Sequence, residues 1–529
     1  MRVLAMAAAI GLAATACGSP SNVESDSDSV VVAVSTFATE TLDPSLDGTS
    51  ALIYFGPMYD SFIGADQDGT PSFENGVLES LEPNAEGTEY TMRLHPGITW
   101  QDGEAMTSED LVFSLDYLRR PEAACTLCGY LKQNIVSAQA VDELTATVTL
   151  NAPDFNLVNL FAPTEGALQV VPKHYIERVG AEEFAKNPIG SGPWKFVNRQ
   201  LGQSIEYEAN TEYWNEDRVP QFSNLKLLLA PEGSTRVAML QQKDADLALL
   251  LPGDIGRAEA TGASIVGAKN VALDHVVFWG SSNPNVITHD ERIREALAIA
   301  VDWDTIVSTY MPEQAGTRHA GGASPFSSIS LGSDPDLAPY AYDPERAKAL
   351  LAEAGYTGQP ITYWNYDAMG SLVGQSEVNE SIASYWRAVG VNVVMRAVDF
   401  ATFRDKYKSV PQQFDETANV SVMQISARPS VISNLTINLP SQADNGTTEA
   451  YWDPASGVEE IRDLKAISDP GAFEDALREY NRKLYSEYWS IPYASQNSVW
   501  GQGPKIGSWE PTDGTDSSYN FETLTPASN

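Results

Sequence analysis

The chain has 529 residues, 43% hydrophobic and 20% charged, a globular composition with enough apolar material for more than one domain. It carries 33 lysines and arginines against 71 aspartates and glutamates, a net charge of −38, which argues against nucleic acid or anionic lipid headgroups as partners. The acidic balance favours solubility, and attraction of cationic ligands is an alternative interpretation.

The first residues predict an exported protein. Met1-Arg2 is followed by an uncharged, alanine-rich run from Val3 to Ala16, which is shorter than the ~20 residues of a membrane span and typical of a secretory signal. Because the run ends in Ala14-Thr15-Ala16-Cys17, it resembles a bacterial lipobox, and residues 1–17 are expected to be a signal peptide with a lipidated Cys17. An ordinary signal peptide with a chance cysteine is the alternative. The polar residues 18–29 predict a flexible tether.

Alternating strand patterns and helix-capping residues predict an α/β chain. Thr107 is expected to cap a helix with acids in its first turn, the stretch from Thr288 to Glu291 has capping-box spacing, and Asp343-Pro344 reads as an N-cap followed by proline. Strands are expected at 29–35, 89–95, 145–150, 224–229, 360–363 and 391–397, with a long helix near the C-terminus that carries Phe473 and Leu484.

Two cysteines remain after Cys17. Cys125 and Cys128 form a Cys-x-x-Cys pair, which would indicate redox or zinc chemistry in a cytosolic protein. There is no second cysteine pair and the five histidines are scattered, so four zinc ligands are not evident and no metal site is predicted. Because the chain is expected to be exported, a local disulfide between Cys125 and Cys128 is the favoured interpretation.

Several sequence motifs occur in a fixed order. They are rich in glycine, proline and aspartate at turns, so they report architecture more than ligand chemistry. Arg294, inside one of them, is expected to pair with a nearby acid. The motifs are YTMRLHPGITWQDGEAMTSEDLVFSLDYL at 90–118, NPIGSGPW at 187–194, NTEYW at 210–214, ERIREALAIAVDWDTI at 291–306 and the helix segment 343–356.

In this order the motifs resemble the bacterial extracellular solute-binding proteins of family 5, which serve peptide and nickel ABC importers. The resemblance implies a bilobal α/β fold of the periplasmic-binding-protein type, with two lobes joined by a hinge. Lobe one is expected to hold residues 30–275 and 490–529, with an inserted subdomain at about 74–188. Lobe two is expected to hold 276–489, with chain crossings near His275 and Trp489.

The expected ligand site departs from the family pattern. Peptide-binding relatives anchor the ligand's amino terminus with an aspartate late in the second lobe, and the matching stretch here, 423–430, has no carboxylate and contains Arg428 instead. An arginine there favours a ligand carboxylate or phosphate. Aromatic side chains are candidate walls of the site, with core packing as the alternative for each. Trp279 and Phe37 are favoured because each ends a strand near a predicted lobe crossing. The candidates are Phe37, Tyr54, Trp279, Trp364 and Trp489.

The resemblance implies a carrier that works with an ABC permease and its ATPase, without a cofactor, as a monomer. No G-x-S-x-G elbow or P-loop is present, so an enzyme is not predicted. A peptide or similar small solute is the expected ligand. A non-peptide solute (a glycoside, an opine-like compound or a metal chelate) and a surface receptor of the same fold are the alternatives. The expected location is the outer face of the cytoplasmic membrane.

Overall fold

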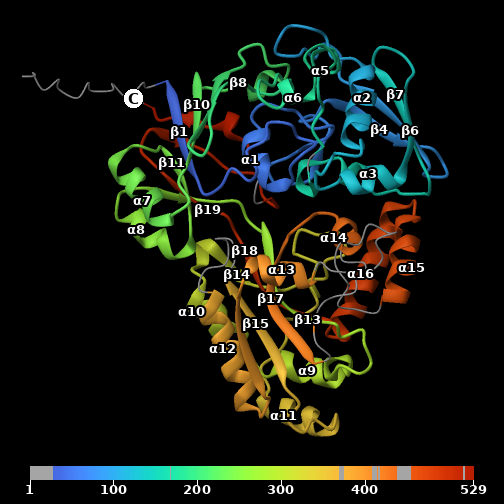
Figure 1. Ribbon diagram of the computed structural model, residues 1–529, viewed down its shortest axis with the longest axis vertical. Helices are drawn as coiled ribbons and strands as arrows, with labels where there is room; N and C mark the ends of the chain where they lie inside the picture. The colour runs from blue at the N-terminus through green and yellow to red at the C-terminus, as the bar shows by residue number, and fades with distance from the viewer. Residues whose placement is uncertain are drawn as a thin grey trace, which may run out of the picture.

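The computed structural model describes residues 28–166, 168–367, 375–407, 414, 417–437, 454–515 and 519–528. Cys17, the predicted signal peptide and nearly all of the predicted tether lie outside the described residues. The chain forms two α/β lobes stacked along the long axis of the molecule, a broad upper lobe and a narrower lower one (Figure 1). The expected bilobal fold is confirmed. Within the described ranges, no helix is both long and apolar enough to cross a membrane.

Lobe one is built on a seven-stranded sheet with β1 (Ser29–Val34) at its centre. The strand SVVVAV is almost continuously apolar because it is buried on both faces, and it pairs in parallel with β10 and β11. Helix α7 (Gly233–Gln242) packs beside β1 and β11, and α8 (Ile255–Glu259) packs beside β12 and β19. The order is β12 (Ser264–Val266), β19 (Val499–Gln502), β11 (Leu247–Leu250), β1, β10 (Asn224–Leu229), β9 (Ser204–Ala209) and β8 (Trp194–Gln200).

A subdomain with its own hydrophobic core and a four-stranded sheet is inserted into lobe one, and its core also includes Phe62 and Ile63, which precede the predicted range 74–188. Its sheet is antiparallel throughout, and the alternating burial of β5 follows the alternation in EYTMRL. Thr107 caps α2 (Ser108–Leu118) in a capping box with Asp110. The strands run in the order β4 (Leu78–Pro83), β5 (Glu89–Leu94), β7 (Thr145–Leu150) and β6 (Ile135–Ala140), with α3 (Cys128–Asn134) and α4 (Leu157–Leu160) near them.

Lobe two is built on a mixed six-stranded sheet that separates two hydrophobic clusters. One face is covered by α9 (Glu291–Ile299), α10 (Trp303–Tyr310), α11 (Pro344–Glu353) and α12 (Gln375–Ala388). The other face carries α13 (Phe400–Tyr407), α14 (Ile432–Ile437), α15 (Pro454–Lys465) and α16 (Pro470–Ser486). The strand order is β14 (Gly316–Arg318), β18 (Ser490–Gln496), β13 (Ala272–Trp279), β17 (Ala418–Ser426), β15 (Ile361–Asp367) and β16 (Val393–Asp399).

Two of the three predicted helix starts match the structure. Asp343 caps α11 and Pro344 is its first residue, as expected. At α9 the cap is Asp290 and not Thr288, because the Asp290 carboxylate accepts the amide hydrogen of Arg292. The Thr288 hydroxyl is instead hydrogen-bonded to that of Ser281, 2.6 Å away.

The chain crosses between lobes at 267–271 and 497–498, not at His275 and Trp489. Strands β13 and β18 lie side by side in the lobe-two sheet from Ala272 and up to Gln496, and β19 enters the lobe-one sheet at Val499. His275 is therefore inside a buried strand. The apolar run that starts at Val276 suggested a later strand start, because Asp274 and His275 are polar residues that the fold buries.

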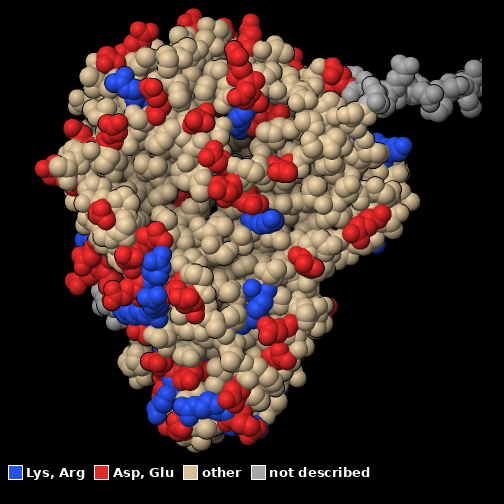
Figure 2. Space-filling model, turned by 180° about the vertical axis from the view of Figure 1, so that it is seen from behind, with Lys and Arg blue, Asp and Glu red and all other residues tan. Residues whose placement is uncertain are grey.

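Acidic side chains are spread over both lobes of the face in Figure 2, and basic ones are sparser. This distribution agrees with the net charge of −38. The negative surface favours solubility and lowers the affinity for polyanions.

Candidate functional site

The lobes meet in a buried polar contact between the inserted subdomain and lobe two. Glu165, at the end of the short helix η2 (Pro163–Glu165), is fully buried. Its Oε1 accepts the amide hydrogen of Ser430 at 2.8 Å, and its Oε2 accepts the Ser433 hydroxyl and lies 3.5 Å from Arg428 Nη1. Arg428 Nη1 also donates to the Glu165 carbonyl at 2.8 Å. We call this set of contacts the Glu165 seam.

A second ion pair extends the Glu165 seam. Lys465, at the end of α15, lies 3.0 Å from the carboxylate of Asp154 in the inserted subdomain. Its carbonyl accepts the amide hydrogen of Phe155 at 3.1 Å, and the Tyr130 hydroxyl donates to the same Asp154 carboxylate at 2.7 Å. The two lobes are therefore held together by hydrogen bonds and ion pairs from which water is largely excluded.

Arg428 has a protein partner in this structure. Sequence reasoning assigned its guanidinium to an anionic group of the ligand. Here the charge is compensated by Glu165 of the opposite lobe, and Nη1 also donates to the Ser433 hydroxyl at 3.0 Å. Burial raises the pKa of Glu165 to about 7, and the positive charge of Arg428 opposes that rise. The structure thus gives Arg428 a role in holding the lobes together.

Two predicted wall residues, Phe37 and Tyr54, belong to the core of lobe one. Phe37 is 2% exposed and meets the Tyr54 ring edge-on at 6.1 Å. Tyr54 is fully buried in α1 (Leu52–Phe55), and its hydroxyl donates to Asp47 at 3.1 Å. Their rings are enclosed by protein, as expected under the core-packing alternative.

Trp279 and Trp364 pack in the core of lobe two. The Trp279 ring stacks on Tyr407 at 5.2 Å and donates its indole hydrogen to Ser421 at 2.8 Å. Trp364 donates to Asn419 at 3.0 Å. Both belong to one hydrophobic cluster. Trp279 ends β13 as predicted, whereas Trp364 lies inside β15, beyond the expected end of that strand, and helices on this face of the sheet cover both.

Trp489 has a structural contact that the sequence did not indicate. The Arg294 guanidinium lies 4.0 Å from the centre of its ring and donates to the carbonyls of Glu487, Thr288 and His289. The expected pairing of Arg294 with an acid is therefore wrong, because main-chain oxygens and an aromatic face satisfy the guanidinium.

A small cavity lies at the junction of the two lobes, close to the chain crossings. Pro252, in the lobe-one helix η4 (Pro252–Asp254), faces residues of lobe two across it. Asp274 of β13 is 2% exposed and lines the cavity beside Gln496 of β18, whose amide donates to Asp274 Oδ2 at 2.5 Å. Burial raises the pKa of Asp274 to about 7. We call this space the Asp274 cavity.

A second cavity, of about 60 Å³, lies inside lobe one between its main sheet and the inserted subdomain. Its polar groups largely satisfy one another. Asp60 accepts hydrogen bonds from Tyr213 at 2.7 Å and Trp214 at 3.0 Å, and Arg218 forms an ion pair with Glu522. These contacts lie within lobe one, and Arg218 also donates to the carbonyl of Asn75, at the edge of the inserted subdomain, at 3.2 Å.

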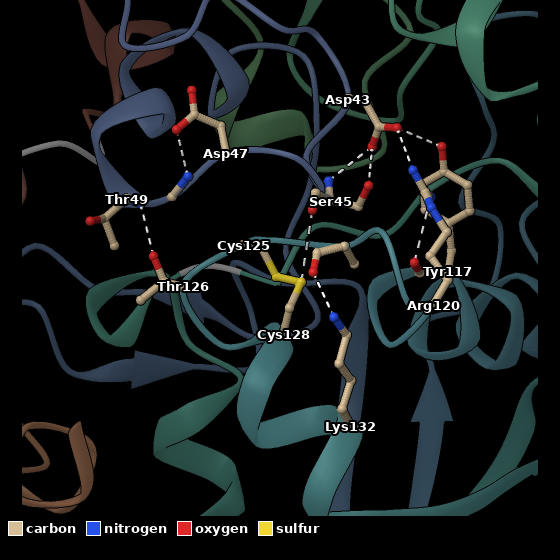
Figure 3. The surroundings of a disulfide bond; sticks show 12 residues. Asp43, Ser45, Asp47, Thr49, Tyr117, Arg120, Cys125, Thr126, Cys128 and Lys132 are labelled. Atoms are coloured by element: carbon tan, nitrogen blue, oxygen red, sulfur yellow. Dashed lines mark hydrogen bonds and ion pairs between the residues drawn. A yellow bond between two sulfur atoms is a disulfide. The ribbon is translucent and has the colours of Figure 1, made fainter. Parts of the chain in front are cut away.

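Cys125 and Cys128 are bonded to each other at the start of α3 (Figure 3). The loop that they close lies against the segment after residue 44, where the Ser45 carbonyl accepts the amide hydrogen of Ala124 at 2.7 Å. Thr126, within this loop, packs beside Gly166, the residue that follows Glu165. The disulfide therefore pins a loop that supports the Glu165 seam.

Sequence reasoning missed Glu165 and Asp274. The sequence contained a sign of the role of Asp274, because it is a charged residue within the mostly apolar strand ALDHVVFW. It contained none for Glu165, since the partners of this residue lie more than 260 positions away along the chain.

Two α/β lobes, two chain crossings and buried contacts between the lobes define the class of two-lobed solute-binding proteins. The family model "Bacterial extracellular solute-binding proteins, family 5 Middle" matches residues 72–446. The chain belongs to this family, and it is a solute-binding protein of the ABC-importer type.

Relatives and structures agree with this assignment. The glutathione-binding protein GsiB of Pectobacterium atrosepticum is 26% identical over 399 residues, which cover 74% of this chain and 73% of GsiB. The oligopeptide-binding protein AppA of Bacillus subtilis is 24% identical over 431 residues, 77% of this chain and 75% of AppA. The ABC transporter substrate-binding protein CtaP of Listeria monocytogenes superposes with a TM-score of 0.79 at 18% identity, covering 94% of this chain and 99% of CtaP.

Proposed function

We propose that this protein captures a peptide or a peptide-like solute between its lobes and presents it to an ABC permease, whose ATPase drives uptake. The observation that carries the proposal is the pair of chain crossings, which let two separately folded lobes move about a short junction. The names of the relatives support a peptide-class ligand, since GsiB binds glutathione and AppA binds oligopeptides.

Closure follows from differential binding. A ligand that contacts both lobes stabilises the closed form over the open form by the free energy of the contacts that only closure makes. The Glu165 seam adds protein contacts that form only when the lobes meet. Ligand binding and seam formation therefore favour the same conformation, and the closed, loaded protein is the form that docks on the permease.

A binding screen with a conformational readout tests this function. Thermal unfolding is measured with dipeptides, longer peptides, glutathione and non-peptide solutes, and small-angle scattering follows the radius of gyration. We expect at least one peptide to raise the melting temperature and to reduce the radius of gyration. A solute that is not a peptide as the sole binder, or binding without any change in radius, would contradict the proposal.

We also propose that the protein is exported as a monomer and anchored by a lipid on Cys17 to the outer face of the membrane. The support is the apolar run from Val3 to Ala16 that ends at this cysteine. Cys17→Ala should release the protein from the membrane fraction or leave its precursor unprocessed, while Cys125→Ala should remain anchored. Retention and lipid labelling of Cys17→Ala would exclude the anchor.

A further inference from the structure

The Asp274 cavity combines an apolar wall with polar groups. Ile306 and Met311 contribute apolar surface, and Tyr310 and Tyr493 contribute aromatic rings. Pro252 closes the cavity from lobe one. Its volume of about 20 Å³ accommodates roughly one water molecule or one group of similar size.

Two residues that line this space carry buried polar atoms without a geometric hydrogen bond among the described residues. Asp274 Oδ2 accepts a hydrogen bond from Gln496, and the Gln424 amide donates in turn to Gln496 Oε1 at 2.6 Å. Asp274 Oδ1 accepts no hydrogen bond from any residue that the structure describes. Both amide atoms of Gln375, which is 7% exposed and lines the same cavity, also lack a geometric hydrogen bond among these residues. Burial raises the pKa of the Tyr366 hydroxyl, and the Gln375 amide lies near enough to oppose that rise.

Such an arrangement is unfavourable unless something fills it. Leaving a buried acceptor without a donor costs about 1–3 kcal/mol, and more for a charged group. Two acceptors, Asp274 Oδ1 and Gln375 Oε1, are available, and no lysine or arginine lines the cavity among the described residues. A cationic hydrogen-bond donor of about the size of water would compensate the charge of Asp274 and donate to the open acceptors.

The residues that line the cavity favour one kind of cation over others. Sodium and calcium ions prefer more oxygen ligands than the two open acceptors offer, and no group of three metal-binding side chains occurs within the described residues. An ammonium group needs fewer acceptors, and aromatic rings attract it. At about 20 Å³ the cavity has room for the ammonium group itself, and a carbon chain behind the nitrogen would lie outside it.

We propose that the Asp274 cavity binds a compact ammonium group, either a free ammonium ion or the –NH₃⁺ end of a solute. The second source rests on the proposed function, because it makes the amine part of the carried solute. In either case Pro252 of lobe one closes over a group held by lobe two, so occupancy favours the closed arrangement of the lobes.

Calorimetry with defined probes tests the site. Ammonium chloride, methylammonium chloride and n-butylammonium chloride are titrated into the full-length protein, with sodium and potassium chloride at equal ionic strength as controls. We expect at least one ammonium probe to bind and the metal salts not to bind. Tighter binding of ammonium chloride identifies the free ion, and tighter binding of n-butylammonium identifies the end of a solute.

Matched variants assign the binding to the cavity. Asp274→Asn keeps the shape and removes the charge, and it should weaken the ammonium probe at least tenfold. Gln375→Leu should weaken it severalfold. Asp246→Asn is the control, since Asp246 is a largely buried carboxylate of lobe one that lies outside the cavity and accepts the amide hydrogen of Val31; it should bind like the wild type. Circular dichroism verifies that each variant is folded.

The proposal is overturned if no ammonium probe binds, if sodium chloride gives the same heat, or if Asp274→Asn binds as tightly as the wild type. The peptide screen reports separately on the proposed function. If a peptide binds but no ammonium probe does, the ammonium site is wrong and the proposed function stands. If an ammonium probe binds but no peptide does, the ammonium site stands and the proposed ligand class is wrong.

Discussion

Glu165 and Asp274 are both buried carboxyl groups at places where the lobes meet, and burial raises the pKa of each to about 7. Their surroundings differ. Both oxygens of Glu165 accept hydrogen bonds, and an arginine lies beside them. Asp274 accepts the Gln496 amide hydrogen on one oxygen, the Gln424 amide also opposes the rise in its pKa that burial causes, and its Oδ1 has no geometric hydrogen bond among the described residues. A buried carboxylate whose oxygens all accept hydrogen bonds from the protein stabilises the fold. A buried carboxylate with a free oxygen beside a cavity indicates a ligand site.

The largest effect is expected for Glu165→Ala. In the closed arrangement the substitution leaves the Arg428 guanidinium buried without a counter-charge, which typically costs about 3–5 kcal/mol. Urea denaturation followed by tryptophan fluorescence measures the loss. Glu109→Ala is the control, because Glu109 pairs with Lys173 at an exposed site and its loss should change stability little. Equal losses for both variants would mean that the Glu165 seam contributes no more than a surface ion pair.

Asp274→Asn should stabilise the folded protein, whereas Glu165→Ala destabilises it, and the size of this effect should depend on pH. The folded pKa of about 7 lies above the usual value of 3.8, so the folded protein binds more protons than the unfolded chain between pH ~4 and ~7. Stability therefore falls as the pH rises through this window. Without an added ligand, Asp274→Asn should be more stable than wild type by about 2–4 kcal/mol at pH 8.

At pH 4 the same two proteins should differ little, because Asp274 is then protonated in the folded state. Thermal unfolding at both pH values measures the difference. A variant that is less stable than wild type at pH 8 would show that the Asp274 carboxylate is satisfied, and the contrast with Glu165 would disappear.

The smallest effect is expected for the disulfide. A bridge that closes so short a loop should contribute about 2 kcal/mol. Cys125→Ser/Cys128→Ser should lose this amount, and mass spectrometry of unreduced, alkylated wild-type protein should find no free thiol. Reductant should destabilise the wild type and leave the double variant unchanged. Two alkylated thiols in the exported protein would exclude the disulfide.

Local patterns determined much of the fold. The apolar run 29–34, the alternation in 89–94 and the cap at Thr107 each specify an element through neighbouring residues, and the structure contains all three. The ordered motifs identified the two-lobed class because turn residues such as glycine and proline constrain the backbone wherever they occur.

The candidate site was predicted less well. Aromatic residues at strand ends are equally suited to a ligand wall and to a core, and only packing distinguishes the two. Trp279 and Phe37 are enclosed because helices and loops from distant parts of the chain cover them. The first chain crossing was predicted a few residues too late, because Asp274 and His275 are polar and their sequence does not show that they are buried within β13.

The sequence by itself determined many of the strands, two of the three capped helix starts, the family and the expectation of export, since these depend on short stretches of chain. Only the tertiary structure decided which charges meet. Arg428 and Glu165 are separated by 263 positions, and their pairing follows from the way in which the inserted subdomain folds against lobe two. The openness of Asp274 likewise depends on Gln496, Gln375 and Pro252, which the two chain crossings bring around one carboxylate.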